Sequence, residues 1–248
     1  MGFKTDGSVH YDGVQNELDT IDFLNTLDRY TEEVKHYGGT TQKADAKSGD
    51  KCISIKRKKG IKNGSYDYAN TSIYNHIFGD HFAQFLEDVK EHRIMSQQLR
   101  EVSVDFMRKD FNDLCASALD SITSDELISM LNDIFSKQSG YDIVINDTNT
   151  REIFIFDAES HPVINALKNG YVPELITSRG AKSSRKIVFK KGDDVINTGL
   201  RIRVTSNNGI NAFLGLSRAN KNSQIVVKLQ QDAVGQLVID ANAKHYTY

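Results

Sequence analysis

An acidic residue, a serine and a lysine are spaced, early in the chain, in a way that suits phosphodiester hydrolysis. Asp45 precedes a Ser48-Gly49-Asp50 turn, and Ser54 and Lys56 lie on the segment that follows the turn. Magnesium held by carboxylates neutralises a phosphate group and activates water, and a nearby lysine positions that water or stabilises the developing charge. The pattern therefore indicates metal-assisted hydrolysis of a phosphate ester.

The alternation of side chains along a strand explains why Ser54 and Lys56 are grouped. Successive side chains of a β-strand point to opposite faces, so residues two apart share a face. Ser54 and Lys56 are then directed at the same site, while Ile53 and Ile55 anchor the strand in the core. Residues 40–47 and 51–56 are predicted to be the two strands on either side of the turn.

A helix over about residues 12–30 is predicted to precede these strands. Its apolar residues recur at helical spacing, and Gly38-Gly39 ends the segment: Val14, Leu18, Ile21 and Leu24. Glu17 lies beside this stripe and shares a face with Ile21 and Leu24. We therefore expect Glu17 to face the sheet and to offer a further carboxylate.

The series Asn16-Glu17, Ala44-Asp45-Ala46 and Ile53-Ser54-Ile55-Lys56 resembles the nuclease core of the PD-(D/E)xK superfamily over about residues 12–60. In that superfamily a helix is followed by a strand with Asp and a strand with (Glu/Asp)-x-Lys. The resemblance implies an α/β fold with a mixed central sheet flanked by helices. It also implies a Mg²⁺-dependent endonuclease that cuts double-stranded DNA at a specific sequence, like a small type II restriction enzyme. The implied catalytic residues are Asp45, Ser54, Lys56 and Glu17, and the implied metal ligands are Asp45, Glu17 and the Ile55 carbonyl.

Ser54 departs from the superfamily pattern, because an acidic residue is expected two positions before the lysine. A serine is a weaker metal ligand than a carboxylate, so the alternative is a catalytically weak DNA-binding protein with a nuclease-like fold. A homing or phage nuclease is a further alternative. Each residue also has an ordinary interpretation: Asp45 as turn chemistry, Lys56 as a soluble strand end, and Glu17 as a helix-surface charge.

DNA contacts are expected from local basic clusters, because 31 Lys and Arg against 33 Asp and Glu give a net charge of −2. One cluster is the run 56–59, a second spans 179–191, and a third is Arg201 with Arg203. The flexible, basic segment 178–186 suits a loop inserted in a DNA groove. The residues expected to bind DNA are Lys58, Ser178, Arg179, Lys182, Arg201 and Arg203.

The rest of the chain is predicted to be helical over 73–137 and rich in β-strands over 141–248, within one nuclease domain over 1–248. Thr123 and Glu126 have capping-box spacing ahead of an apolar stripe, and Gly140 closes that helix. Short apolar runs at 143–145, 153–156, 187–189, 200–204 and 225–229 indicate strands. The stretch 66–71 could be a loop whose aromatic and amide groups touch a DNA groove, but it is expected to pack against the start of the following helix.

Composition argues against several other classes of protein. The chain has 248 residues, 39% of them apolar, with no run long enough to span a bilayer and no secretory pattern at its start. Two cysteines are too few for a disulfide framework or a zinc site, and no nucleotide-binding or serine-hydrolase motif occurs. We expect a soluble, cytoplasmic protein with Mg²⁺ as its cofactor and DNA as its partner. A homodimer would match a symmetric DNA site.

Overall fold

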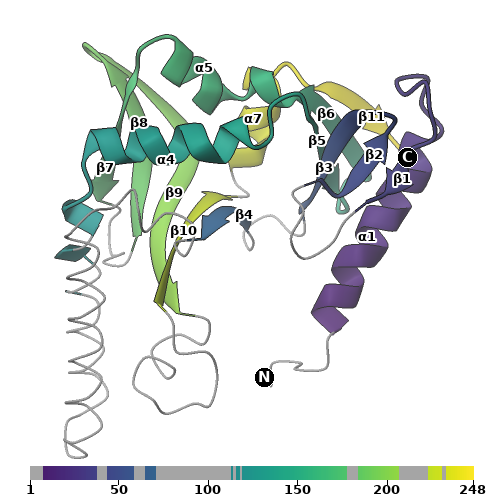
Figure 1. The fold of residues 1–248 in the computed structure, drawn as a ribbon, viewed down its shortest axis with the longest axis horizontal. Coiled ribbons are helices and arrows are strands. Elements are labelled where there is room, and N and C mark those ends of the chain that lie inside the picture. Colours follow the sequence, from purple (N-terminus) through teal and green to yellow (C-terminus); the bar gives the residue numbers. More distant parts are fainter. Residues whose placement is uncertain are drawn as a thin grey trace, which may run out of the picture. The chain divides into compact units, whose positions relative to one another are not determined.

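The computed structural model describes residues 8–37, 44–58, 65–70, 113, 116–117, 119–177, 184–206, 223–230 and 233–248. Their contacts divide the chain into two compact units (Figure 1). Unit 1 comprises residues 1–64, 135–165 and 234–248, and unit 2 comprises residues 65–134 and 166–233. That all 248 residues form a single nuclease domain stays a prediction.

Unit 1 is built on a six-stranded mixed sheet. Its order is β1 (Lys35–His36), β2 (Ala46–Ser48), β3 (Lys51–Lys58), β5 (Asp142–Asp147), β6 (Glu152–Asp157) and β11 (Lys244–Thr247). Strands β3 and β5 are parallel, and every other neighbouring pair is antiparallel. The helices of this unit include α1 (Ser8–Leu24) and α7 (Val234–Asp240), with the short 3₁₀ helix η2 (Ala158–Ser160) after β6. An α/β fold with a mixed sheet and flanking helices is therefore confirmed.

Helix α1 packs on one face of this sheet. Ile21 and Leu24 join a buried cluster with Ile53 and Ile55 of β3 and with residues of β5 and β6. The helix ends at Leu24 and not near residue 30. Asn25 stops it, since its side chain donates to the Val34 carbonyl at 3.0 Å and accepts from the Val34 amide at 2.7 Å.

A tight turn joins β2 to β3 at the predicted position. Gly49 has φ +55°, and a Cβ atom there would lie 2.5 Å from a carboxylate oxygen of Glu32. The positive φ favours glycine, whereas the flexible Glu32 side chain could move away from a Cβ atom. Ser48 donates to the Glu32 carbonyl at 2.7 Å and ties the turn to the preceding loop. Strand β3 matches the predicted 51–56 run and extends it by two residues, whereas β2 covers only the end of the predicted 40–47 strand.

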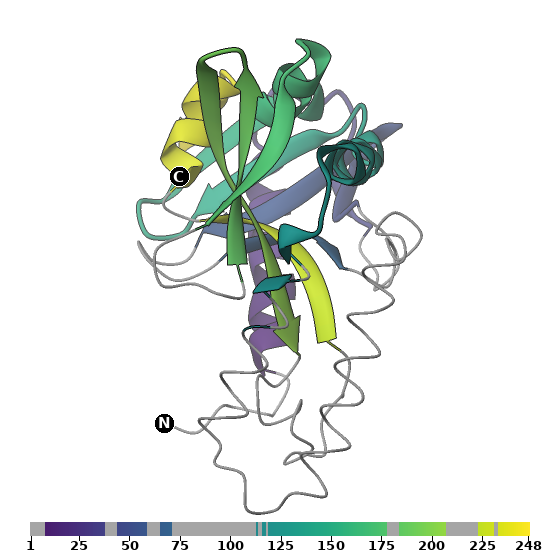
Figure 2. The same cartoon turned by 90° about the vertical axis from the view of Figure 1, so that its left-hand side faces the viewer.

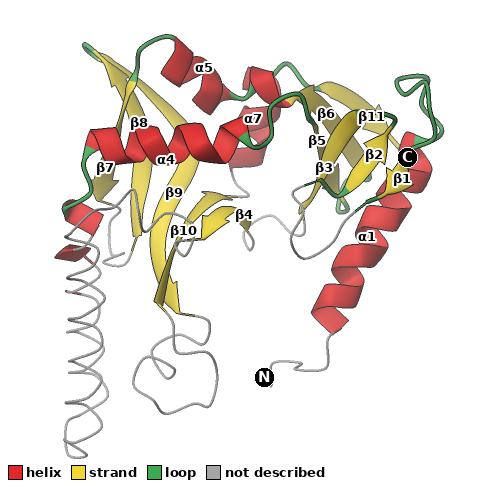
Figure 3. Cartoon of the chain, in the orientation of Figure 1, coloured by secondary structure: helices red, strands yellow, loops and turns green. Residues whose placement is uncertain are grey.

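Unit 2 contains a five-stranded antiparallel sheet (Figure 3). Its order is β4 (Ser65–Asn70), β10 (Ser223–Gln230), β9 (Asp194–Ser206), β8 (Ser184–Lys191) and β7 (Val172–Thr177). Residues 65–70 form the edge strand β4 against β10, a pairing that the sequence analysis did not predict. The expected packing of 66–71 against the following residues, which lie outside the described part of the chain, stays a prediction. Pairing with a strand that is distant in the sequence determines the strand conformation of residues 65–70. The local composition of a segment does not reveal such pairing.

Helix α4 (Ser124–Ser136) begins and ends as predicted. The Glu126 carboxylate accepts from the Thr123 amide at 2.8 Å, and the Thr123 hydroxyl accepts from the Glu126 amide at 3.3 Å, which completes a capping box. Gly140 closes the turn after it with φ +74°. The helix α5 (Pro162–Lys168) follows η2 and is the last helix before β7 (Figure 2). Among the described helices, none combines the length and apolar character needed to cross a membrane.

Candidate functional site

Asp45 immediately precedes β2, and backbone hydrogen bonds hold it from both sides. Its amide donates to the Ile53 carbonyl of β3 at 2.9 Å, and its carbonyl accepts from the Tyr37 amide at 3.0 Å. Asp45 is therefore bonded to β3 on one side and to the residue after β1 on the other. These two bonds fix the origin of its side chain at the point where the β2–β3 pairing ends.

The Asp45 carboxylate gathers three groups from β3. Its Oδ2 atom accepts from the Ile55 amide at 2.6 Å and from the Ser54 hydroxyl at 3.2 Å. The Lys56 ammonium lies 3.9 Å from the same oxygen. The Asp45 and Lys56 side chains are 21% and 25% exposed, so this cluster is reachable by a ligand. The structure thus brings together three of the four predicted catalytic residues.

The predicted alternation of β3 is confirmed. Ile53 and Ile55 belong to the buried cluster beneath α1, whereas Ser54 and Lys56 do not. Ser54 is fully buried, so its hydroxyl serves to orient Asp45. The Ile55 amide points at Asp45, and the amide and carbonyl of one strand residue project from the same strand edge. The Ile55 carbonyl therefore lies on the same edge as the Asp45 carboxylate.

Glu17 is not brought to this cluster. Its carboxylate lies 3.1 Å from Nε2 of His36, and both side chains are partly exposed. His36 pairs with Ala46, which belongs with Ile53 to the buried cluster on the α1 side of the sheet. Ser54 and Lys56 alternate to the opposite face. The expectation that the carboxylate of Glu17 joins that of Asp45 is therefore not met in the contacts of the described residues.

The oxygen donors available for a metal are few. Within the described part of the chain, no three His, Cys, Asp or Glu side chains are grouped closely enough to bind one ion. Asp45 Oδ1 has no hydrogen-bond or ion-pair partner among the described residues, since all three contacts fall on Oδ2. Among the described residues, the oxygen donors on this edge without a described partner are thus Asp45 Oδ1 and the Ile55 carbonyl.

Lys58 has a structural partner. Its ammonium lies 2.5 Å from the carboxylate of Asp147, which is aligned with it on the parallel strand β5. Burial alone would raise the pKa of Asp147, but hydrogen bonds from Lys58 and Asn149 outweigh it and lower that pKa below its usual value. The expected DNA contact of Lys58 would require this short ion pair to open.

The predicted DNA-contact segment divides into two parts. Ser178, Arg179 and Lys182 lie outside the described residues. Residues 184–186 are the start of β8, so the loop expected over 178–186 is wrong at that end. Arg185 is buried and makes two hydrogen bonds, of 2.8 and 3.0 Å, to the Asp120 carboxylate. Arg201 is half-buried and Arg203 is exposed, both on β9.

A buried polar network behind the site was missed by the sequence analysis. The side-chain amide of Asn146 on β5 donates to the Thr20 hydroxyl at 2.8 Å and to the Asn16 side chain at 3.2 Å, and its oxygen accepts from the Tyr248 hydroxyl at 2.9 Å. These bonds join α1, β5 and the end of the chain. The available signal was the polar residues that flank the apolar run 143–145, namely Asp142, Asn146 and Asp147.

Comparisons with known proteins add no relative. No protein-family model, curated protein or solved structure matches the chain. The geometry and chemistry of the site are therefore the basis for its proposed function.

Proposed function

We propose that this chain is a Mg²⁺-dependent endonuclease of the PD-(D/E)xK kind, which hydrolyses double-stranded DNA at a specific sequence as type II restriction enzymes do. The gathering of the Asp45 carboxylate, the Ser54 hydroxyl and the Lys56 ammonium at one strand edge supports this most directly. They follow helix α1 in the order that the resemblance implies, with Asp45 immediately before one strand and Ser54-x-Lys56 on the next.

The donor set suits Mg²⁺, which prefers one or two carboxylate oxygens and keeps several waters. Asp45 Oδ1 and the Ile55 carbonyl would hold the ion. When bound, it would neutralise charge on the phosphate and lower the pKa of a coordinated water. Glu17 would join the ligands only if its contact with His36 opened.

The chain's own residues have separate roles in this proposal. The Lys56 ammonium donates hydrogen bonds to the attacking water or to a phosphate oxygen, and it stabilises negative charge there. The Ile55 amide and the Ser54 hydroxyl occupy Asp45 Oδ2, which leaves the other oxygen for a ligand. Ser54 is thus a positioning residue that takes no direct part in the chemistry.

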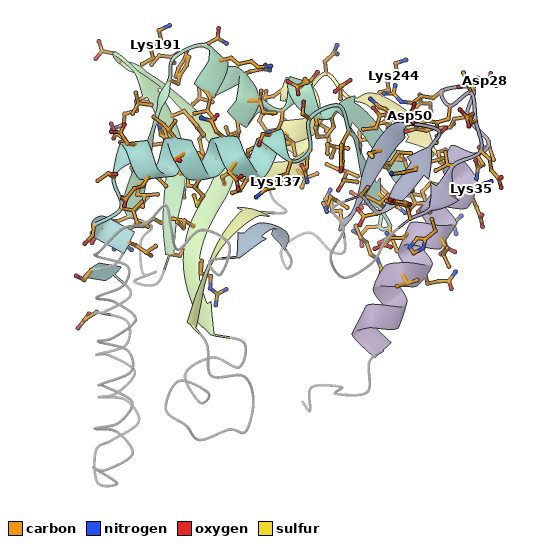
Figure 4. The ribbon with its side chains drawn as sticks, in the orientation of Figure 1. Asp28, Lys35, Asp50, Lys137, Lys191 and Lys244 are labelled. Atoms are coloured by element: carbon orange, nitrogen blue, oxygen red, sulfur yellow. The ribbon has the colours of Figure 1, made fainter. Side chains whose placement is uncertain are left out.

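Incubation of plasmid and phage DNA with the purified protein, with Mg²⁺ or with EDTA, tests this proposal. Discrete fragments that require metal are expected, and they should disappear in Asp45→Asn and Lys56→Ala. Asp50→Asn and Lys35→Ala are matched controls, because both residues are exposed in unit 1 (Figure 4). Normal cutting by the Asp45 and Lys56 variants would overturn the site assignment.

The second candidate is a DNA-binding protein with weak or no cleavage, and the serine at position 54 favours it. DNA that shifts on a gel in metal but stays intact at long incubation would support this reading. Ser54→Asp then asks whether an added carboxylate restores cutting.

A further inference from the structure

The sheet of unit 2 places basic residues directly opposite each other. Lys186 of β8 pairs with Arg201 of β9, and Arg201 pairs in turn with Lys228 of β10. Opposite side chains in an antiparallel pair share a face, with Cβ atoms about 4.5–5.5 Å apart. Arg203 lies two residues along β9 and belongs to the same face. We call Lys186, Arg201 and Arg203 the basic row.

No described acidic side chain pairs with the basic row. Glu174, on the adjacent strand β7, is 2.5 Å from Lys190. Asp67 of β4 stands opposite Lys228 in register, at the far side of the sheet from β8. The basic row therefore keeps its charge uncompensated by the surrounding described residues.

Arg185 shows the contrasting arrangement on the other face of β8. Its guanidinium is buried and is bonded to the Asp120 carboxylate through both Nε and Nη2. Arg185 pairs with Ile202, whose side chain is fully buried. A described carboxylate thus partners the buried Arg185, whereas no described carboxylate partners the basic row on the opposite face.

Like charges directly opposite each other destabilise a sheet. At this spacing they lie within one Debye length, about 8 Å at physiological salt, so ions screen the repulsion only in part. A bound polyanion neutralises the like charges, and the relief of their repulsion favours its binding. Arginine and lysine side chains in such an array suit phosphate oxygens, and arginine binds them in a bidentate manner.

We propose that the basic row binds the phosphate backbone of double-stranded DNA. The identification of DNA as the partner depends on the proposed function, whereas the binding surface is inferred from the strand register of unit 2. Ser184 and Val188, which flank Lys186 on this face, are buried. The proposed contacts of the basic row are to phosphate oxygens, and such contacts carry no sequence information.

Fluorescence anisotropy of a labelled duplex, measured in EDTA so that no cleavage occurs, tests the basic row. Lys186→Gln, Arg201→Gln and Arg203→Gln should each weaken binding roughly fivefold to tenfold at 0.1 M salt, and should each lower the slope of log K against log salt by about 0.9. The loss should be equal for duplexes of unrelated sequence. Lys190→Gln is the matched control, because Lys190 lies on the same face of β8 but is paired with Glu174.

Thermal unfolding without DNA separates a binding role from a structural one. Removing one of two opposed charges should raise the melting temperature of Arg201→Gln by about 1–3 °C. A structural arginine would lower the melting temperature when replaced. Unchanged DNA affinity in all three variants, or a lower melting temperature with a loss of affinity, would overturn the inference.

The outcomes for binding and cleavage are distinguishable. If the protein cuts DNA but the variants of the basic row bind normally, the inference fails and the proposed function stands. If those variants lose DNA binding while no condition produces cleavage, the inference stands and the endonuclease proposal fails. Equal loss of binding to heparin and to DNA would support the row as a phosphate and sulfate contact, whereas loss for heparin alone would overturn DNA as its partner.

Discussion

Asp45, Asp142 and Asp147 of unit 1 each lie near a lysine, yet they occupy two different environments. Asp142 and Asp147, at the two ends of β5, are 1% exposed, with lysine ammonium groups at 3.0 and 2.5 Å. Asp45, immediately before β2, is 21% exposed in its side chain, and Lys56 lies at 3.9 Å. Asp142 and Asp147 are thus buried and paired, and we call them the closed carboxylates, while Asp45 keeps one oxygen without a described partner.

The pKa values of the closed carboxylates agree with this division. Burial would raise the pKa of Asp142, but Arg29 and Lys51 together lower it below its usual value. Tyr30 also donates to the same oxygen as Arg29, at 3.0 Å. A buried carboxylate with two hydrogen-bond donors and a lysine ammonium at 3.0 Å is committed to the fold, and this leaves Asp45 as the carboxylate proposed to bind a ligand.

The largest expected effect is on cleavage. Asp45→Asn should lower the rate of DNA cleavage by about a thousandfold or more, because it removes the anionic oxygen that would hold the metal. Its free energy of unfolding should change by less than about 1 kcal/mol, because the amide oxygen can still accept from Ile55. Single-turnover cleavage and urea unfolding check both halves. Loss of folding together with loss of cleavage would place Asp45 with the structural carboxylates.

Asp142→Asn should show the reverse pattern. It leaves Arg29 and Lys51 without their buried partner, and we expect a loss of about 2–3 kcal/mol, reduced from the fully buried case because both cations are partly exposed. Asp157→Asn is the control, since Asp157 is 47% exposed and lies 3.7 Å from the same Lys51. Urea unfolding of the two variants should differ by at least about 1 kcal/mol. Equal stabilities would remove the distinction between the two environments.

The local parts of this arrangement were predictable from the sequence. The Gly49 turn, the alternation of β3 and the Thr123 capping box depend on residues close together in the chain, and all three are confirmed. The proximity of Asp45 to Ser54 and Lys56 follows from the same short hairpin. The length of the turn in a hairpin fixes the register of its two strands. The spacing of these residues in the sequence was therefore enough to predict that they lie close together.

The distant pairings were not predictable. Glu17 was expected beside Asp45 because helical spacing shows which face of α1 is apolar, but it does not show how that face lies on the sheet. The contact of Glu17 with His36 depends on the placement of β1. The ion pair of Lys58 likewise required the parallel alignment of β3 with β5, whose residues are about ninety positions apart. A single sequence carries no signal for either contact.

The pH dependence of stability should come from the titration of buried groups. His161 is buried, its Nδ1 accepts from the Val163 amide at 3.2 Å, and burial lowers its pKa to about 3. Because the folded pKa lies below the unfolded value of 6.5, the unfolded state binds the proton more readily, and stability present above pH 6.5 is lost as pH falls toward 3. The slope should approach about 1.4 kcal/mol per pH unit in this window.

Urea unfolding between pH 4.5 and 8 measures this slope. In His161→Asn, which keeps an acceptor for the Val163 amide, the slope below pH 6.5 should be much smaller, while above pH 7 the two proteins should vary in parallel. The lowered pKa values of Asp142 and Asp147 act separately, because their stabilisation is present above about pH 4 and is lost below it. An unchanged slope in His161→Asn would show that His161 is accessible to protons in the folded state.

The smallest expected effect concerns the residue that departs from the superfamily pattern. Ser54→Ala removes one hydrogen bond of 3.2 Å to Asp45 but leaves the Ile55 amide bond of 2.6 Å to the same oxygen. We expect cleavage to slow by about threefold to tenfold, which corresponds to about 0.5–1.5 kcal/mol, the usual net value of a hydrogen bond. If Ser54 only positions Asp45, the Mg²⁺ concentration for half-maximal rate should rise by no more than that factor. A hundredfold rise in that Mg²⁺ concentration would instead indicate that the Ser54 hydroxyl is a metal ligand, and Ser54 would then belong with Asp45 to the ligand-binding residues.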